Sequence, residues 1–224
     1  SFIASANSIL YTGATPVFAD IDSRTYNVDP KDIERKITKK TKAIMVVHTY
    51  GHPCKIEKIM EIAKKHGLFV IEDCAEAHGA KENGKIIGSF GHISCFSFFG
   101  NKIITTGEGG ICLSDNKELI EKILIYKNHG MNKSKRYFHN VVGYNYRMTN
   151  LSAALGLAQL EQFPLFLQTR EEHEYQYRKC FAGCNAINFS PKRQESRPVY
   201  WMHSFLINSD KISRDNLMEA LARR

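Results

Sequence analysis

The stretch VIEDCAEAHG, residues 70–79, decides the fold of this chain of 224 residues. It continues an apolar run from residue 68, which is typical of a strand buried on both faces. Glu72 and Asp73 follow this run directly, and Glu76 and His78 come a few residues later. Open α/β sheets bind ligands at the carboxyl ends of such strands. The stretch therefore predicts a strand that carries acidic side chains to a binding edge, although Asp73 taken alone more often caps a turn.

The preceding residues alternate between helical and strand patterns. Helices are predicted over 2–12, from Pro30 after the capping residue Asp29, and over 56–65 with a stop at Gly67. Strands are predicted over 16–20, 43–47 and 68–71. This alternation indicates an α/β fold with a largely parallel central sheet.

The regular alternation of predicted helices and strands ends after residues 70–79. Residues 94–99 and 110–113 read as strands joined by a glycine-rich turn, and Asp115 is expected to cap a helix that reaches Tyr126. A long polar loop is expected over 133–146, followed by a helix from Asn150, a charged helix over 170–179, a strand over 201–208 and a helix over 215–224. We expect one large domain over 1–165, and over 166–224 a connecting helix with the start of a smaller domain.

Composition narrows the function classes. The chain is 43% hydrophobic and 24% charged, which excludes a long disordered or repetitive protein. Its net charge of +8 comes from scattered lysines and arginines with no nucleic-acid-binding module, so we expect no nucleic-acid partner. No apolar run approaches the roughly 20 residues of a membrane span, so no membrane partner is expected either. The six cysteines lack zinc-ligand spacing, which predicts no metal site and a reducing, cytoplasmic location.

Cysteines also occur in the predicted strands. Cys74, Cys95 and Cys112 lie in apolar, strand-like runs. Thiols in such runs usually behave as small hydrophobic side chains. We therefore expect all three to behave in this way.

The stretch FSFFGNKIITTGEGG, residues 96–110, contains a lysine between an aromatic strand and an apolar pair. Burial disfavours the charged form of an amine, so Lys102 is a candidate nucleophile, although most lysines reach the surface. The glycines lack the Gly-Lys-Ser/Thr ending of a P-loop, which argues against a nucleotide triphosphatase. A strand-end Asp73 with a buried lysine 29 residues later is what a pyridoxal phosphate enzyme requires, because the carboxylate keeps the pyridine nitrogen protonated and the lysine binds the aldehyde.

A third stretch, VGYNYRMTN at residues 142–150, precedes the helix from Asn150 and is uninformative alone. With the other two it resembles the DegT/StrS-type sugar-nucleotide aminotransferases, which are fold-type-I pyridoxal phosphate enzymes. The resemblance runs through residues 3–8, 13–17, 72–77, 96–110 and 141–162. It implies a three-layer α/β/α large domain with a mostly parallel central sheet, and the start of a smaller α+β domain.

Four residues match cofactor-binding positions of this family. The resemblance implies that Lys102 binds the cofactor aldehyde and later moves a proton, and that Asp73 pairs with the pyridine nitrogen. It implies that Glu76 contacts the ring near its hydroxyl and that Ser97 binds the phosphate. Lysine at position 102 also argues against the family's sugar 3-dehydratases, which carry histidine there.

Two further residues match positions that serve other partners. The resemblance implies that Asn145 reaches the cofactor phosphate of a neighbouring subunit, and hence a homodimer. Arg147 is a weaker match to a residue that binds the carboxylate of the amino donor.

The resemblance implies an aminotransferase that uses glutamate and a nucleotide-linked 4-keto-6-deoxy sugar, in the synthesis of surface glycans or lipopolysaccharide. Acceptors linked to other nucleotides, such as UDP or dTDP, remain open, as does a non-catalytic paralogue or remnant. Family members begin upstream with a Gly-Thr segment and a ring-stacking aromatic residue, and they continue through a full small domain. We therefore expect this chain to be the central part of a longer enzyme.

Overall fold

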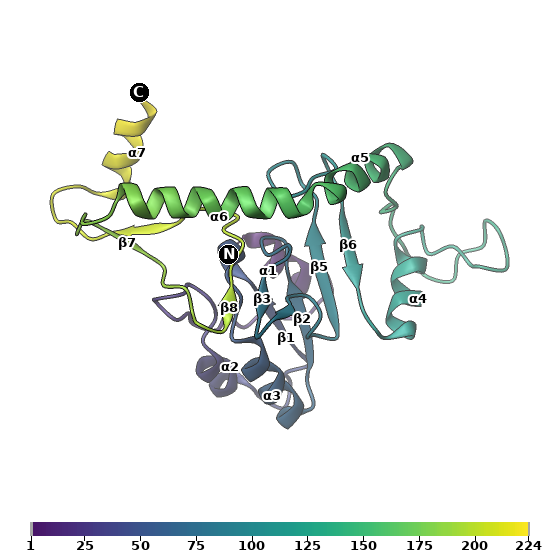
Figure 1. Cartoon of the computed structure of the whole chain (residues 1–224). Coiled ribbons are helices and arrows are strands. Elements are labelled where there is room, and N and C mark those ends of the chain that lie inside the picture. The colour runs from purple at the N-terminus through teal and green to yellow at the C-terminus, as the bar shows by residue number, and fades with distance from the viewer. Residues whose placement is uncertain (1, 224) are drawn as a thin grey trace.

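The computed structural model describes residues 2–223 of the chain (Figure 1). The first half alternates helices and strands around a central sheet. Its elements are α1 (Ile3–Leu10), α2 (Pro30–Lys36), β1 (Ala43–Val47), the 3-10 turn η1 (Thr49–Gly51), α3 (Ile56–His66), β2 (Phe69–Asp73), β3 (Lys81–Glu82), β4 (Lys85–Ile86) and β5 (Ile93–Ser97).

The second half starts with the last strand of the central sheet and then becomes mainly helical. Its elements are β6 (Gly110–Leu113), α4 (Lys117–Tyr126), α5 (Asn150–Glu161), α6 (Phe163–Cys180), β7 (Ile187–Phe189), β8 (Ser196–Arg197), β9 (Phe205–Ile207) and α7 (Arg214–Ala222). None of the helices within residues 2–223 is both long and apolar enough to cross a membrane.

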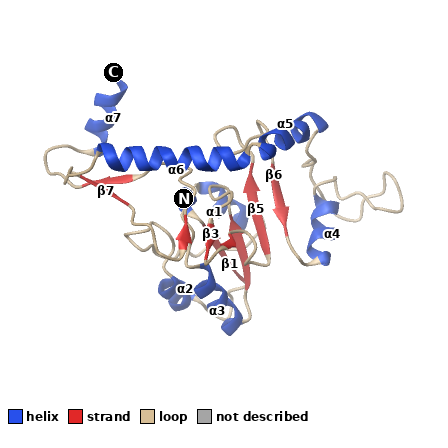
Figure 2. Cartoon of the chain, viewed as in Figure 1, coloured by secondary structure: helices blue, strands red, loops and turns tan. Residues whose placement is uncertain are grey.

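The central sheet has the strand order β1-β2-β5-β6. β1, β2 and β5 run parallel, with Val47 paired to Asp73 and Asp73 paired to Cys95, and β6 runs antiparallel to β5. The long helix α6 crosses one end of this sheet, and α2 and α3 lie near its other end (Figures 1 and 2). The predicted α/β class and mostly parallel sheet are confirmed.

The core lies between α3 and the parallel strands. Ile56 and Ile59 of α3 and Val46 and Val70 of the sheet are fully buried. Burying a side chain of this size contributes roughly 1.5–3 kcal/mol. The strands are therefore fixed in place where their carboxyl ends meet the candidate site.

Local signals set the ends of the helices beside this core as predicted. The Asp29 side chain accepts a hydrogen bond from the Lys31 backbone N–H at 3.0 Å, and Pro30 occupies the first turn of α2. Gly67 ends α3 in the left-handed conformation, with a φ of 64°.

Three details of the predicted secondary structure are wrong. No strand forms over 16–20, because the backbone there bonds to α2 instead of a neighbouring strand: the Asp32 carboxylate accepts from the Asp20 N–H at 2.6 Å. Asn116, and not Asp115, caps α4, since its side chain accepts the N–H groups of the first helical turn. The strand predicted over 201–208 is confined to β9, and the short strands β3, β4, β7 and β8 were not predicted. The helix predicted over 215–224 forms as α7, and its last predicted residue lies outside the described residues.

Candidate functional site

The carboxyl ends of the parallel strands meet at one edge of the sheet. β2 ends at Asp73 and β5 ends at Ser97, so both predicted residues occupy the last strand position. β1 ends one residue before His48, whose N–H donates to the Asp73 carbonyl at 3.2 Å. This is the edge where open α/β sheets bind their ligands.

Asp73 is half-buried and held by two donors. Its Oδ2 accepts a hydrogen bond from the Ser5 hydroxyl of α1 at 2.6 Å, and its Oδ1 accepts from the Ala75 N–H at 3.1 Å. The carboxylate is therefore oriented by one contact from its own turn and one from a helix 68 residues earlier. The sequence carried no signal for the role of Ser5, because the contact is long-range.

Glu76 is buried in the turn that follows Asp73. Its Oε2 accepts the backbone N–H of Tyr50 at 2.6 Å. Tyr50 is a non-glycine residue with a φ of 56°, which brings its N–H to this carboxylate at the cost of backbone strain. Residues in strained conformations are concentrated at functional sites.

Lys102 lies five residues after the end of β5, in a turn that folds back on the strand. Its N–H donates to the Phe99 carbonyl at 3.0 Å, and the following Ile103 and Ile104 are buried. This apolar pair anchors the turn that carries Lys102.

The electrostatics of Lys102 agree with the prediction from the sequence. Burial lowers the pKa of the Lys102 amine, and the nearby carboxylates of Glu76 and Asp73 offset part of that effect. The amine lies 3.9 Å from the ring centre of Trp201. The site therefore holds a half-buried amine beside two carboxylates, with no ion pair engaging the amine within residues 2–223.

Ser97 is the last residue of β5. Its hydroxyl accepts a hydrogen bond from the Phe99 N–H at 3.2 Å, which leaves its proton free to donate to a ligand. The loop beyond it is closed by the Phe98 carbonyl, which accepts from the Thr105 hydroxyl and the Thr106 N–H, both at 2.9 Å. The hydroxyl of Ser97 and the amine of Lys102 thus belong to one folded loop.

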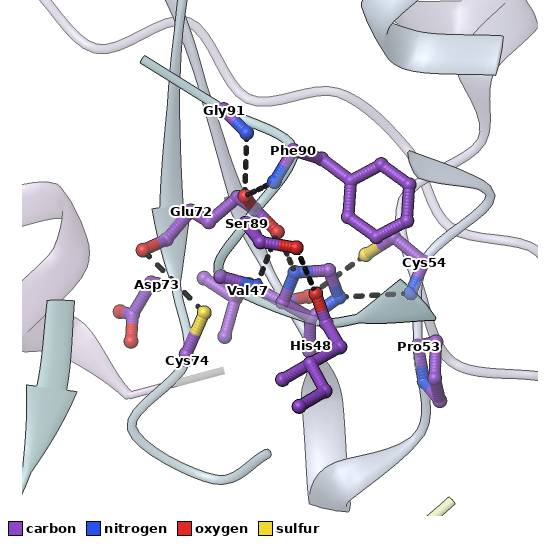
Figure 3. A network of polar contacts seen from close by, with 12 residues as sticks. Val47, His48, Pro53, Cys54, Glu72, Asp73, Cys74, Ser89, Phe90 and Gly91 are labelled. Atoms are coloured by element: carbon purple, nitrogen blue, oxygen red, sulfur yellow. Dashed lines mark hydrogen bonds and ion pairs between the residues drawn. The ribbon is translucent and has the colours of Figure 1, made fainter. Parts of the chain in front are cut away.

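A buried polar network lies behind the site (Figure 3). Glu72 is fully buried and accepts the N–H groups of Gly88, Phe90 and Gly91, and its Oε2 lies 3.2 Å from Nε2 of His48. Burial alone would raise the pKa of Glu72, but the bond to His48 and those backbone N–H groups bring the pKa below its usual value.

Asp73 points away from this network in Figure 3, as expected for consecutive residues of a strand. His48, Glu72 and Cys74 are close enough to share a metal ion. However, Nδ1 of His48 accepts the Cys54 N–H at 3.0 Å and its Nε2 faces Glu72. Because these donor atoms are already engaged, the arrangement favours a structural brace for the strand end.

His78 is a buried residue whose chemistry the sequence did not define. Both of its ring nitrogens lack a hydrogen-bond partner within the described residues, and the ring packs against Phe96 and Phe98. Burial, with a contribution from the positive charge of Lys102, lowers the pKa of His78 to about 4. The ring is therefore neutral at pH 7 and adds no positive charge beside Lys102.

Asn145 and Arg147 are not brought to this edge. Both are exposed on the long loop, which is pinned to the end of α4 by bonds such as Tyr144 N–H to the Tyr126 carbonyl at 2.7 Å. Neither side chain has a hydrogen bond or ion pair within residues 2–223. α4 and this loop project away from the parallel strands (Figure 1).

The cysteines only partly match their prediction. Cys74 is buried, but Cys95 is half-buried and Cys112 is exposed. Cys112 lies on β6, the outer strand of the sheet, where no further strand covers it. The two thiols are cross-strand neighbours with sulfur atoms 3.7 Å apart, and all six cysteines are free.

The donor set suits a phosphate-bearing aromatic aldehyde. A half-buried amine, an oriented carboxylate and a free hydroxyl proton come from Lys102, Asp73 and Ser97, all at one sheet edge. The carboxylate of Asp73 has no ion-pair partner in the described part of the chain, so it can still accept a proton donor from a ligand. The residues present therefore fit pyridoxal phosphate.

Comparison with known proteins agrees with this geometry. The model of the DegT/DnrJ/EryC1/StrS aminotransferase family matches residues 1–224. The chain is 51% identical over 225 residues to GDP-perosamine synthase of Escherichia coli O157:H7, which covers 99% of this chain and 60% of that relative. It is 48% identical over 156 residues to UDP-N-acetyl-3-dehydro-alpha-D-glucosamine 3-aminotransferase of Acidithiobacillus ferrooxidans, which covers 69% of this chain and 42% of that relative.

A solved structure matches as well. Helicobacter pylori PseC, an aminotransferase involved in the biosynthesis of pseudoaminic acid, superposes with a TM-score of 0.93 at 33% identity, covering all of this chain and 61% of that one. The chain thus spans about 60% of the length of the curated relatives that match nearly all of it.

Proposed function

The chain belongs to the DegT/DnrJ/EryC1/StrS aminotransferase family, and from this premise we propose that the protein is a pyridoxal phosphate-dependent aminotransferase acting on a nucleotide-linked sugar. Glutamate is the amino donor, and a 4-keto-6-deoxy sugar is the acceptor. The observation that carries the proposal is the half-buried amine of Lys102, with its lowered pKa, at the same sheet edge as Asp73. An amine of that kind is uncharged more often than a surface lysine and can act as a nucleophile.

Each site residue has a defined task in this proposal. When bound, pyridoxal phosphate supplies an electron-withdrawing ring that stabilises negative charge at the α-carbon of the amino donor. Lys102 would hold the cofactor aldehyde through its amine, and the same amine would take the proton from that α-carbon. Asp73 keeps a proton on the ring nitrogen, Glu76 contacts the ring near its hydroxyl, and Ser97 donates to the phosphate.

The same lysine serves both halves of the exchange. In the second half, the amino group taken from glutamate would replace the C4 oxygen of the sugar, which leaves as water, and Lys102 would deliver a proton to C4. Glutamate leaves as 2-oxoglutarate, which balances the transfer. Arg147 is our candidate for holding the carboxylate of glutamate.

The proposal includes a homodimer in which Asn145 binds the cofactor phosphate of the neighbouring subunit. Two observations support it: the Asn145 side chain is exposed and has no partner within residues 2–223, and apolar side chains near it are exposed. Val142 and Leu151, both within six residues of Asn145 in the chain, are each 86% exposed.

Two features support the remaining parts of the proposal. Residues 1–165 would form the central part of the cofactor-binding domain, and 166–224 the connecting helix and the start of a small domain, with the long α6 at the junction. The six free thiols support a reducing, cytoplasmic location.

The sugar is proposed from the relatives. The 51% identity to a GDP-perosamine synthase over nearly the whole chain favours GDP-4-keto-6-deoxymannose as acceptor and GDP-perosamine as product. The relative at 48% identity is described as an aminotransferase for a UDP-linked 3-keto sugar, and its match covers a smaller part of the chain. A UDP-linked keto sugar is therefore the second candidate acceptor.

One experiment tests both the chemistry and the substrate. The full-length protein is loaded with pyridoxal phosphate, reduced with borohydride and digested, and we expect the cofactor to be fixed on Lys102 by mass spectrometry. The loaded protein is then incubated with glutamate and GDP-, UDP- or dTDP-linked keto sugars. Formation of the GDP-linked 4-amino sugar supports the proposal. If only the UDP-linked sugar is converted, the acceptor is a UDP-linked sugar and the proposed GDP-linked acceptor is wrong. A cofactor fixed on a residue other than Lys102 contradicts the proposed site.

A further inference from the structure

Lys102 has a neighbour that the residue roles above do not include. Its amine lies over the ring of Trp201, 3.9 Å from the ring centre, although the two residues are 99 positions apart. Trp201 is the single tryptophan of the chain and belongs to the segment that returns to the sheet after α6. A cation at this distance from an indole face is attracted by the negative face of the ring.

The ring is held by its own polar edge. Its Nε1–H donates to the Asn101 carbonyl at 2.9 Å, next to Lys102 in the chain. The indole therefore bonds to the same turn whose lysine it faces. This fixes the ring plane relative to the lysine side chain.

The backbone beside the ring is fixed independently. The Arg170 guanidinium donates to the Trp201 carbonyl at 3.0 Å, and the Val199 N–H donates to the Gly51 carbonyl at 3.0 Å. A Cβ at Gly51 would lie 2.8 Å from the Val199 side chain and 3.1 Å from the Trp201 nitrogen, so this close approach requires glycine. Trp201 thus sits on a segment tied both to α6 and to the turn after β1.

The charges around Lys102 define what the ring does. Asp73 and Glu76 attract the amine from the end of β2 and the turn after it, and His78 on that turn is neutral at pH 7. Burial acts in the opposite direction and favours the uncharged amine. The indole face adds attraction for the charged form without adding a charge of its own.

We propose that Trp201 is a positioning residue for Lys102, whose indole face gives the charged amine a fixed resting place beside Asp73 and Glu76. This inference rests on the proposed function, in which Lys102 would hold the cofactor aldehyde and its free amine would carry a proton. A free lysine side chain has several rotatable bonds, and contact with the indole ring restricts the positions that its amine occupies. Trp201 also links the C-terminal segment to the reactive amine.

The test measures the amine directly and needs no turnover. The full-length protein, freed of cofactor, is labelled with a trace of acetic anhydride at a series of pH values, and mass spectrometry reports the titration of each lysine. In Trp201→Leu we expect the pKa of Lys102 to fall by about 0.4 to 1.5 units, the range that a cation–π contact supports. In Trp201→Phe, which keeps an aromatic face, the fall is smaller.

An internal control comes from the same digest. Lys135 lies 4.7 Å from the ring centre of Phe138 on the exposed loop, so its titration must not change in either Trp201 variant. Phe138→Leu is the matched substitution, and it must leave Lys102 unchanged. Circular dichroism and the thermal midpoint establish that each variant is folded.

The outcomes separate the two proposals. If Trp201→Leu does not fold, Trp201→Phe decides, because a weaker ring must still lower the pKa of Lys102. An unchanged Lys102 titration in the folded variants overturns the role of Trp201, whatever the enzyme's activity. Failure of borohydride to fix the cofactor on Lys102 overturns the proposed function and leaves the labelling result valid.

Discussion

The strand-end region around Asp73 and Glu76 and the long loop around Asn145 and Arg147 differ in how their candidate functional side chains are held. Asp73 and Glu76 at the strand end each accept short hydrogen bonds from other parts of the fold. On the loop, the backbone is bonded to α4, but the side chains of Asn145 and Arg147 are exposed and have no polar partner within residues 2–223. The first region is organised by contacts within this chain, whereas the second leaves both of these side chains exposed.

This difference separates two kinds of functional residue. A residue that acts within its own subunit can be fixed by the surrounding fold, which reduces the entropy lost on binding. A residue that serves a neighbouring subunit is exposed until that subunit is present. The exposed state of Asn145 therefore agrees with its proposed role in a homodimer.

The largest expected effect comes from mixing two inactive variants. Lys102→Ala removes the amine, and Asn145→Ala removes a phosphate contact, so each full-length variant alone should have little or no activity. If Asn145 acts on the neighbouring subunit, a mixed dimer contains one intact site. Dissociating and reassociating an equal mixture should then restore about a quarter of the wild-type activity, since half of the dimers are mixed.

The matched control is Asn145→Ala mixed with Asp73→Ala, which must also regain activity because Asp73 is organised within its own subunit. Lys102→Ala mixed with Asp73→Ala must stay inactive, because both changes affect the same site. Activity that stays absent in the first mixture, although mixed dimers are demonstrated by native mass spectrometry, would place Asn145 and Lys102 in the same subunit's site.

The sequence was informative about the strand-end region for a physical reason. Buried parallel strands require continuous apolar runs, so the run before Asp73 located the end of β2, and the apolar residues around Lys102 predicted its lowered pKa. Contacts between distant segments leave no such pattern. Ser5 with Asp73, Tyr50 with Glu76, and Trp201 with Lys102 depend on the three-dimensional path of the chain.

The predicted strand over 16–20 failed for a related reason. An apolar run predicts a strand only if a partner strand supplies hydrogen bonds, and here the Asp32 side chain accepts the Asp20 N–H instead. Val17 and Phe18 of this run are 70% exposed in the described chain. The run alone could not reveal which partner its backbone would find.

A second prediction concerns pH and the strand-end region. The pKa of the buried His78 is lowered to about 4, whereas an unfolded histidine titrates near 6.5. The unfolded state therefore binds more protons between these pH values. The contribution of neutral His78 to the free energy of unfolding is fully present above about pH 6.5 and is lost as the pH drops toward 4. A shift of this size corresponds to about 3 kcal/mol at pH 4.

His78→Phe, which keeps a ring against Phe96 and Phe98, removes this titration. Urea unfolding at pH 7, 6, 5 and 4 should show a smaller loss of stability in this variant than in the wild type. The buried His52, whose pKa is also lowered to about 4, remains and preserves part of the dependence. His139→Asn on the exposed loop is the control, and equal pH profiles for His78→Phe and the wild type would contradict the prediction.

The smallest expected effect tests whether hydrogen bonds within the chain fix the strand-end carboxylate of Asp73 before a ligand binds. Ser5→Ala removes the 2.6 Å hydrogen bond to Oδ2 of Asp73 and leaves the Ala75 N–H as the remaining donor to that carboxylate. A lost hydrogen bond of this kind costs about 1 kcal/mol, so we expect cofactor binding to weaken about fivefold in a fluorescence titration. Ser8→Ala is the matched control, because the Ser8 hydroxyl bonds to the Ser5 carbonyl and does not reach Asp73. Tighter binding in Ser5→Ala would show that Ser5 competes with the ligand for Oδ2, and the orientation of Asp73 would then depend on the ligand more than on α1.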